Sequence, residues 1–345
     1  MSDMSRVRLD DELNIDALPP GEISRLRIEI GHNALGAAMR LPVLVARGRK
    51  PGPVFGVTAA VHGDEINGIP VIHRLFNKLN PQNMRGALVA VLVVNLPGFH
   101  EHERQFSDRR DLNHLMPGRS DGNEAQLYAW RFMHRVARHF DFLVDMHTAS
   151  FGRINSLYVR ADMTHEATAR IAYQLEPEII VHNPAHDGTL RGAVRALGIP
   201  SVTLEIGNPL RFQQRYIERS LAGLRAVLSD CGVTPRRKPL KPKETVLCAS
   251  SKWLYTDHGG LLTVLPGVTD FVRAGEVVGT LSNIFGDAIA TYSAQSDGVV
   301  IGKSVNPVGR SGARILHLGE VVSQEHPFFR RETESVGAAN NPGGQ

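Results

Sequence analysis

A histidine and a glutamate whose spacing suits metal binding follow the first strongly apolar run of the sequence. His62 and Glu65 are three residues apart and come after the run Val54–Val61. A neutral imidazole and a carboxylate are two of the three protein ligands in a His₂Glu catalytic zinc site. Gly63 lets the backbone turn sharply, so that both side chains can face one point. The alternative is that Glu65 caps the next helix and His62 packs at a strand end.

A second histidine closes another apolar run. His147 follows Phe142–Met146, and Asp145 lies two residues before it, on the same side of an extended strand. Because ligands gather outside the carboxyl ends of strands in open α/β sheets, this position strengthens the metal-site interpretation of His62. Asp145 is a candidate for the carboxylate that orients a ligand imidazole. The alternative is that Asp145 only caps a strand end.

A glutamate lies at the end of a third apolar run. Glu205 belongs to the segment Val202–Ile206, which Gly207 follows. A metal-bound water needs a base beside it, and glutamate has this role in zinc hydrolases. The alternative interpretation is a surface glutamate that precedes a turn.

The polar segment Asn95–Gly118 is about twenty residues long, and a loop of this length inside a compact domain is usually functional. Arginine suits a substrate carboxylate or an oxyanion that forms in the transition state. We expect one or two of its cations to be functional and the others to be solvated. The segment contains Arg104, Arg109, Arg110, Asn113 and His114.

For His62, His147 and Glu205 to form one site, the strands that they follow must end at the same edge of a sheet. The first part of the chain has the pattern of such a sheet. Apolar strand-like runs alternate with helix-like segments, which predicts an α/β domain with helices on both faces of the sheet. The expected strands are Val54–Val61, Ala87–Asn95, Phe142–Met146 and Val202–Ile206, and the expected helices are Ile69–Leu79, Glu124–Phe140, His165–Leu175 and Gln213–Leu228.

A change of composition divides the chain. The stretch TPRRKPLKPK holds three prolines and five cations, which is typical of a linker. We therefore predict a first domain at 1–235, in which 1–40 is an N-terminal extension packed on it, and a basic, proline-rich linker at 236–244. Short β-type runs broken by glycine predict a β-rich module at 245–330. Residues 331–345 are expected to form a disordered tail.

The composition excludes several classes of protein. Hydrophobic residues make up 42% and charged residues 21% of the 345 residues, which is ordinary for a globular protein. The longest apolar run, Ala87–Val94, is far below the roughly 20 residues that span a bilayer. Two cysteines provide neither a disulfide framework nor a cysteine-based zinc site. Without the five cations of the linker the net charge would be negative, which argues against nucleic acid as a partner. We expect a cytoplasmic protein without a membrane partner.

In their order, these motifs resemble the succinylglutamate desuccinylase/aspartoacylase family, which are zinc hydrolases related to carboxypeptidase A. The resemblance covers about residues 40–230 and rests on H-G-D-E, D-L-N-x-x-x-P-G, D-x-H-T and E-x-G. It implies a mixed sheet of the zinc-carboxypeptidase type and one Zn²⁺ per chain, held by His62, Glu65 and His147. It also implies that Glu205 is the catalytic base and that Arg104, nine residues after Asn95, stabilises the transition state.

One position departs from the family pattern. The family binds a substrate carboxylate with an asparagine–arginine pair, which corresponds here to Asn113 and His114. Histidine offers neither the fixed fork nor the permanent charge of a guanidinium. We therefore expect weak binding of dicarboxylic substrates, unless Arg109, Arg110 or Arg191 supplies the missing cation.

The last module resembles a lipoyl/biotinyl-type barrel-sandwich, on the segments Gly275–Gly279 and Ala294–Val300. Carrier domains have a lysine about seven residues before the alanine, and here that position is Asp287. We predict that this module has no carrier function and that it packs on, shapes or shields the active site.

The sequence thus predicts a zinc-dependent amidohydrolase that cleaves the linear amide of a small N-acyl amino acid. A metallocarboxypeptidase-like peptidase is the alternative among enzymes. A non-catalytic protein that binds a small molecule on the same scaffold is the alternative from another class. The motifs leave open whether the chain forms a homo-oligomer.

Overall fold

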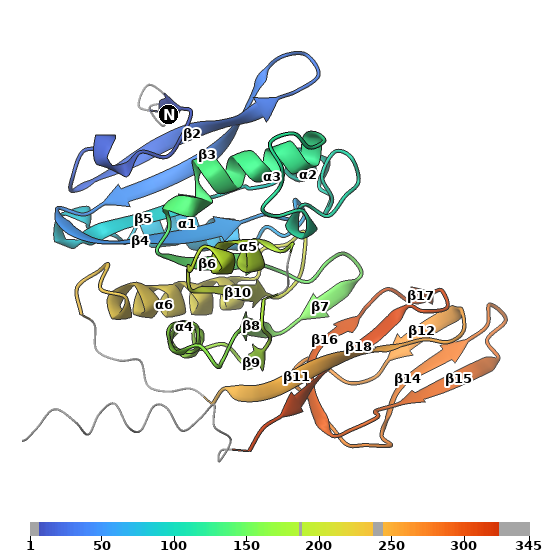
Figure 1. Cartoon of the computed structure of the whole chain (residues 1–345). Helices are drawn as coiled ribbons and strands as arrows, with labels where there is room; N and C mark the ends of the chain where they lie inside the picture. The colour runs from blue at the N-terminus through green and yellow to red at the C-terminus, as the bar shows by residue number, and fades with distance from the viewer. Residues whose placement is uncertain (1–6, 186–187, 237–243, 324–345) are drawn as a thin grey trace, which may run out of the picture.

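The computed structural model describes residues 7–185, 188–236 and 244–323. A mixed sheet of fourteen strands runs through the molecule, in the order β1-β2-β3-β5-β4-β6-β10-β8-β9-β11-β18-β16-β13, with β7 paired to β16 (Figure 1). Its first strands are β1 (Val7–Asp10), β2 (Glu22–His32), β3 (Ala38–Arg47), β4 (Lys50–Ala59), β5 (Arg85–Val91), β6 (Phe142–His147), β7 (Arg153–Asn155), β8 (Leu157–Ala161), β9 (Ile179–His182) and β10 (Ser201–Ile206).

The strands at the centre of this sheet are buried along most of their length. β4 pairs in parallel with both β5 and β6, and β6 pairs in parallel with β10. The five residues Ala87–Val91 of β5 are all fully buried. A strand that is buried on both faces has no alternation of polar and apolar residues, which is why these runs were recognisable in the sequence.

Helices cover both faces of the sheet, as the sequence predicted. One core lies beneath α1 (Gly68–Phe76), α4 (Glu166–Gln174) and α6 (Gln214–Asp230). The other lies beneath α3 (Glu124–Arg135) and α5 (Leu190–Ala196). α6 buries Ile217, Leu221, Leu224 and Leu228, the spacing of one helical face. The prediction of a mixed α/β sheet is therefore confirmed.

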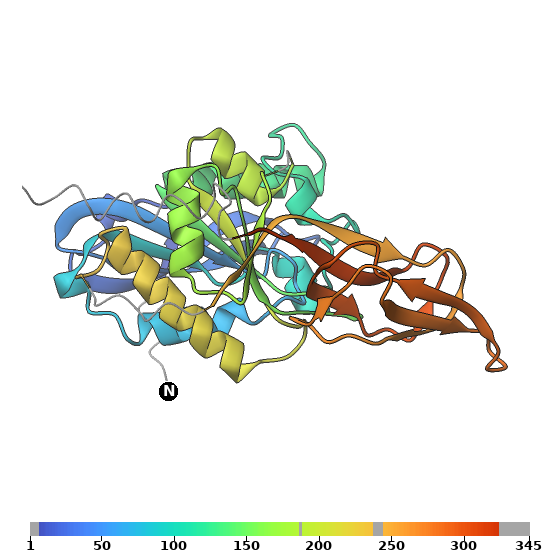
Figure 2. The same ribbon diagram turned by 90° about the horizontal axis from the view of Figure 1, so that it is seen from below.

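The segment 246–321 contains strands and the turns between them, but no helix. They are β11 (Val246–Tyr255), β12 (Gly260–Val264), β13 (Phe271–Val272), β14 (Val277–Ser282), β15 (Ala288–Ser293), β16 (Gly298–Ser304), β17 (Val308–Gly309) and β18 (Arg314–Val321). Four of them form a second sheet in the order β15-β14-β12-β17. A separate core that includes Leu262, Val278 and Ile315 stabilises these strands. Figure 2 shows them projecting from the α/β part as an elongated arm.

Two strand pairings join this arm, residues 246–321, to the α/β part. β11 pairs in parallel with β9, so the large sheet continues into the arm. β7 leaves the α/β part and pairs antiparallel with β16. Residues 237–243 of the predicted linker and the whole predicted tail 331–345 lie outside the described residues. The predicted division into two domains therefore stays a prediction.

The N-terminal region supplies strands as well as packing. β1 and β2 form one edge of the large sheet, and Leu26, Ile28 and Ile30 of β2 are buried in the core beneath α3 and α5. Among the helices that the structure describes, none is both long and apolar enough to cross a bilayer.

Candidate active site

His62 and Glu65 lie in the turn that follows β4, and His147 is the last residue of β6. Because β4 and β6 are parallel, with Ala59 opposite Met146, their carboxyl ends coincide. The N–H of Glu65 donates to the carbonyl of His62 at 3.1 Å, which closes the turn. A Cβ atom at Gly63 would lie 1.9 Å from the backbone of Gly98, so this position needs glycine for close packing.

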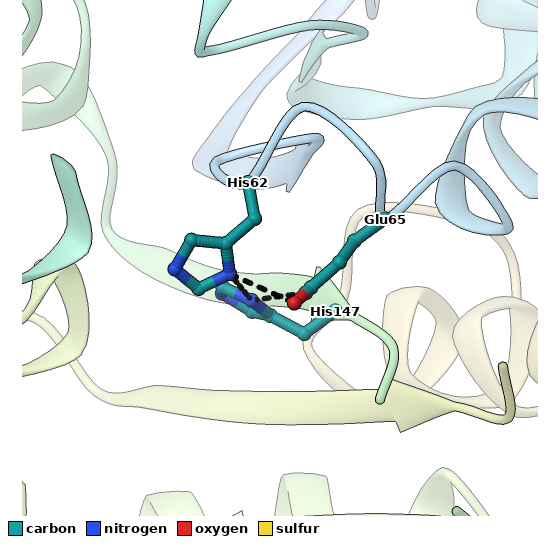
Figure 3. Close-up of side chains that lie close together, drawn as sticks. All are labelled: His62, Glu65 and His147. Carbon is teal, nitrogen blue, oxygen red and sulfur yellow. Dashed lines mark hydrogen bonds and ion pairs between the residues drawn. The ribbon is translucent and has the colours of Figure 1, made fainter. Parts of the chain in front are cut away.

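The three side chains converge on one buried point (Figure 3). His62 Nδ1 lies 3.0 Å from Glu65 Oε1, and His147 Nδ1 lies 2.9 Å from Glu65 Oε2. The two Nδ1 atoms are 3.1 Å apart. Ligands of a tetrahedral zinc ion at about 2.0–2.1 Å would be separated by about 3.3 Å. The three residues therefore form a group that could hold a metal ion.

A carboxylate oxygen lies within hydrogen-bond distance of the Nε2 atom of each imidazole. Asp145 Oδ2 lies 2.7 Å from His147 Nε2, and Thr58 donates to the second oxygen of Asp145 at 2.6 Å. Asp111 Oδ1 lies 2.9 Å from His62 Nε2. Such contacts leave each Nδ1 lone pair facing the centre, as metal ligation requires. Sequence reasoning singled out Asp145 but missed Asp111, which acts from a distant loop.

The charges of these buried groups shift one another's pKa values. Burial alone would lower the pKa of His62, but the Glu65 and Asp111 carboxylates outweigh it and raise the pKa. Burial would raise the pKa of Glu65, whereas the two histidines hold it well below its usual value. The pKa of His147 is raised because Asp145 and Glu65 outweigh burial. A cluster that stabilises positive charge at its centre suits a bound cation.

Arg104 lies directly beside the cluster. Its Nη1 donates to Glu65 Oε1 at 2.8 Å and to Ser150 Oγ at 2.9 Å, and its Nη2 donates to Asp111 Oδ2 at 2.7 Å. The side chain of Asn95, the N-cap of α2 (Leu96–Glu101), donates to the carbonyl of Arg104 at 3.4 Å, which ties the arginine segment to the start of this helix. This guanidinium is positioned to stabilise negative charge that develops next to the three convergent side chains.

Glu205 is buried, so the alternative of a surface glutamate is wrong. It lies on β10 directly opposite His147 on β6. Asn155 Nδ2 donates to Glu205 Oε2 at 3.2 Å, and Arg160 Nη2 lies 3.5 Å from Oε1. Burial raises the pKa of Glu205, and the positive charges of Arg160 and His147 offset this only in part. A raised pKa and a position beside the cluster suit a general base.

Apart from Thr58 and Asn95, these groups line one cavity of about 480 Å³. Of the predicted substrate residues, Asn113, His114 and Arg191 line it as well. The His114 side chain is 65% exposed and lies 3.9 Å from Asp111. Arg109 and Arg110 are exposed and do not belong to the cavity wall. The structure therefore does not place these two arginines where they could grip a substrate.

Sequence reasoning also missed residues that the strands and the arm bring to the cavity. Tyr158 and Arg160 of β8 share one side of the strand, and the spacing i, i+2 is the signal that could have found them. The hydroxyl of Tyr158 accepts from Arg160 Nη2 at 2.6 Å. The sequence carries no local signal for the others, because distant strand pairings position them. They are Asn155, Arg153, Trp253 and Arg314.

Residues 51–230, more than half of the chain, match the family model described as the succinylglutamate desuccinylase/aspartoacylase catalytic domain. The chain belongs to the succinylglutamate desuccinylase/aspartoacylase family. The matched region contains His62, Glu65, Arg104, His147 and Glu205.

One relative is similar to most of the chain in sequence, and two solved structures are similar to it in fold. N-alpha-acetyl-L-2,4-diaminobutyric acid deacetylase from Halomonas elongata is 24% identical over 315 residues, which cover 86% of this chain and 90% of that protein. The product-bound ectoine utilization protein EutE (DoeB) from Ruegeria pomeroyi has a TM-score of 0.79 at 22% identity, over 88% of this chain and 98% of that chain. A succinylglutamate desuccinylase from Silicibacter sp. TM1040 has the same TM-score and identity, over 89% and 98%.

Proposed function

We propose that this chain is a zinc-dependent deacylase that hydrolyses the amide bond of a small N-acyl amino acid. The observation that carries the proposal is the convergence of two imidazole Nδ1 atoms and one carboxylate beside Glu205 and Arg104 in a single cavity. The family match supports it, as does the similarity to the Halomonas relative, which is named as a deacetylase of an acetylated amino acid.

In this proposal His62, Glu65 and His147 hold one zinc ion per chain. When bound, zinc supplies Lewis-acid chemistry, which activates water near neutral pH and polarises a carbonyl. Asp111 and Asp145 keep the two imidazoles oriented through Nε2. Metal analysis of the purified protein tests this part of the proposal directly.

The remaining roles belong to charged side chains of the chain. Glu205 takes the proton of the attacking water and returns it to the leaving amine. Arg104 stabilises the oxyanion that forms at the acyl carbon. Arg191 is buried and donates to the carbonyl and side chain of Asn183, and burial lowers its pKa to about 10. A cation in this state favours an anionic ligand, so Arg191 and the nearby Asn113 are proposed to bind the substrate carboxylate.

The cavity of about 480 Å³ has the size of a small-molecule site. The two alternatives, a carboxypeptidase-like peptidase and a non-catalytic binding protein, predict different results in an assay. A carboxypeptidase would release the last residue of peptides, and a binding protein would hold zinc without turnover. The test is metal analysis of the purified protein with a hydrolysis screen of N-acetyl and N-succinyl amino acids and short peptides. Loss of turnover on chelation and its recovery with zinc support the proposal. Cleavage of peptides alone, or bound zinc without any turnover, would overturn it.

Asp111→Asn should weaken zinc binding by roughly 10–100-fold, because the neutral amide orients His62 less strongly than the carboxylate does. Chelator competition on the purified protein measures the change. Asp108→Asn is the matched control, since Asp108 lies in the same loop and pairs with the exposed Arg110. Equal zinc affinity in the Asp111 and Asp108 variants would show that Asp111 does not support the metal.

Gly302→Ala should lower kcat although Gly302 lies in the arm. A Cβ atom at this position would lie 2.3 Å from Asn155 Oδ1, and Asn155 is the residue that donates to Glu205. A hydrogen bond to a charged group is worth about 1.5–3 kcal/mol, so we expect roughly a tenfold loss or more. Steady-state kinetics and zinc analysis would separate this effect from metal loss.

The matched control is Gly309→Ala, in the same arm, where the nearest atom to an added Cβ is 3.5 Å away. It should keep wild-type kcat. If both variants lose activity equally, or if Gly302→Ala keeps it, the arm does not position Glu205 through Asn155.

A further inference from the structure

The arm exposes more large apolar side chains than the rest of the molecule does. Eleven of the eighteen large hydrophobic side chains that the described residues expose lie in the arm, residues 246–321. Single exposed hydrophobic residues are normal on a folded protein, whereas a group of them in one region marks an interaction surface. Their concentration therefore indicates that the arm contains such a surface.

The hairpin between β14 and β15 presents two of these side chains at its tip, on the side of the arm away from the α/β part (Figure 1). Phe285 is 88% exposed and Ile284 is 77% exposed. Asn283 fixes the turn, because its Oδ1 accepts the N–H groups of Phe285 and Asp287, each at 2.9 Å. The tip thus holds two apolar side chains in solvent on an ordered turn, so binding through it costs little further ordering.

An open groove lies on the same arm. It has a volume of about 380 Å³, and the exposed apolar side chains of Phe151, Tyr255 and Val308 line it. Leu261 of β12 pairs with Ser282 of β14 on one side and with Val308 of β17 on the other. The hairpin tip, which follows Ser282, and the groove therefore lie at the same end of the second sheet.

The tip and the groove carry opposite charges. Asp287 closes the hairpin turn, and Arg310 follows Gly309 at the edge of the groove. Both charged side chains are exposed, and neither belongs to an ion pair within the described residues. Asp287 accepts from the neutral amide of Asn283 at 2.9 Å. The tip is thus apolar and acidic, and the groove is apolar and basic at its edge.

We propose that this end of the arm binds a second copy of the chain, in a two-fold symmetric dimer in which the hairpin tip of each copy lies in the groove of the other. A two-fold interface uses the same patch on both copies, so the patch must be complementary to itself. A patch that combines an apolar, acidic tip with an apolar, basic groove meets this condition. Asp287 of one copy then pairs with Arg310 of the second copy, and the pair forms twice.

Sedimentation equilibrium of the purified full-length chain over a range of concentrations measures the dissociation constant of the dimer. Wild type should dimerise. Phe285→Ser should raise the dissociation constant roughly 100-fold, because burial of such a side chain is worth about tenfold or more and two-fold symmetry removes the contact twice.

Leu35→Ser is the matched control for Phe285→Ser. Leu35 is 92% exposed at the tip of the hairpin between β2 and β3, where Asn33 Oδ1 accepts the N–H groups of Leu35 and Ala37. The two hairpins thus present an exposed apolar side chain on the same kind of turn, but only one of them belongs to the arm. Leu35→Ser should dimerise as wild type does.

A charge reversal tests the contact between the two copies directly. Asp287→Arg and Arg310→Asp should each raise the dissociation constant, because each places two like charges opposite one another. The double variant should recover most of the wild-type affinity, since it restores the pair with the charges exchanged. Local damage to either turn would instead make the double variant weaker than both single variants.

A wild-type chain that stays monomeric at its highest soluble concentration would overturn the proposal, even if the arm bound another protein. So would a dimer whose dissociation constant is the same in wild type and Phe285→Ser, because another surface would then hold the copies together. If Phe285→Ser fails to fold by circular dichroism, the charge reversal decides: absence of rescue in the double variant overturns the proposal. None of these readouts depends on turnover, so the dimer and the deacylase function are tested separately.

Discussion

His147→Ala is expected to remove the metal and the activity together. The imidazole supplies one of the three ligand groups that converge here among the described residues, and its Nδ1 lies 2.9 Å from Glu65 and 3.1 Å from His62 Nδ1. Without it, two protein ligands remain, which is fewer than a catalytic zinc site uses. Lewis-acid stabilisation is worth several kcal/mol, so turnover should fall at least roughly 10³-fold. Metal analysis and steady-state kinetics on the same preparation measure both effects.

The fold should survive this change, because His147 lies at the end of β6 and not among the apolar side chains of either core. Circular dichroism and the thermal midpoint check this point. His73→Ala is the matched control, since His73 is exposed on α1 and outside the cavity. It should keep zinc and turnover. A His147→Ala protein that retained one zinc ion per chain would show that the ligands are wrongly assigned.

The central part of the fold was predictable because buried parallel strands appear in the sequence as continuous apolar runs. Val54–Val61 and Phe142–Met146 read as apolar runs, and the structure contains them as β4 and β6 with their ends together. Since polar residues at the carboxyl ends of such strands share one edge, His62, His147 and Glu205 could be brought together before any coordinates were known. Strand-end position was thus the informative signal.

The rest of the site depends on pairings that no local pattern encodes. Asp111 reaches His62 from a loop 49 residues further along the chain. Arg153 meets Trp253 and Arg314 only because β7 pairs with β16, and β18 with β11. The sequence predicted that the arm would shape the active site, but it could not show which residues the arm contributes. Arg109 and Arg110, which the sequence offered as replacements for the cation missing at His114, are exposed and lie outside the cavity wall.

Glu205→Gln is expected to keep zinc and lose turnover by at least roughly 10². The amide has nearly the same shape as the carboxylate and can still contact Asn155 and Arg160, so the cavity should keep its structure. It cannot accept a proton from water, which is the step that the proposal assigns to Glu205.

The pH dependence adds a second test of the same residue. A general base works only when ionised, so the activity of wild type should fall by about tenfold per pH unit below the pKa of Glu205. Because burial raises this pKa, the fall should begin at a higher pH than an exposed glutamate would give. The residual activity of Glu205→Gln should lack this acid limb. Zinc content measured over the same pH range separates proton uptake by Glu205 from metal loss. If Glu205→Gln loses zinc instead, Glu205 is a metal ligand, and if it keeps full activity with the acid limb unchanged, another group is the base.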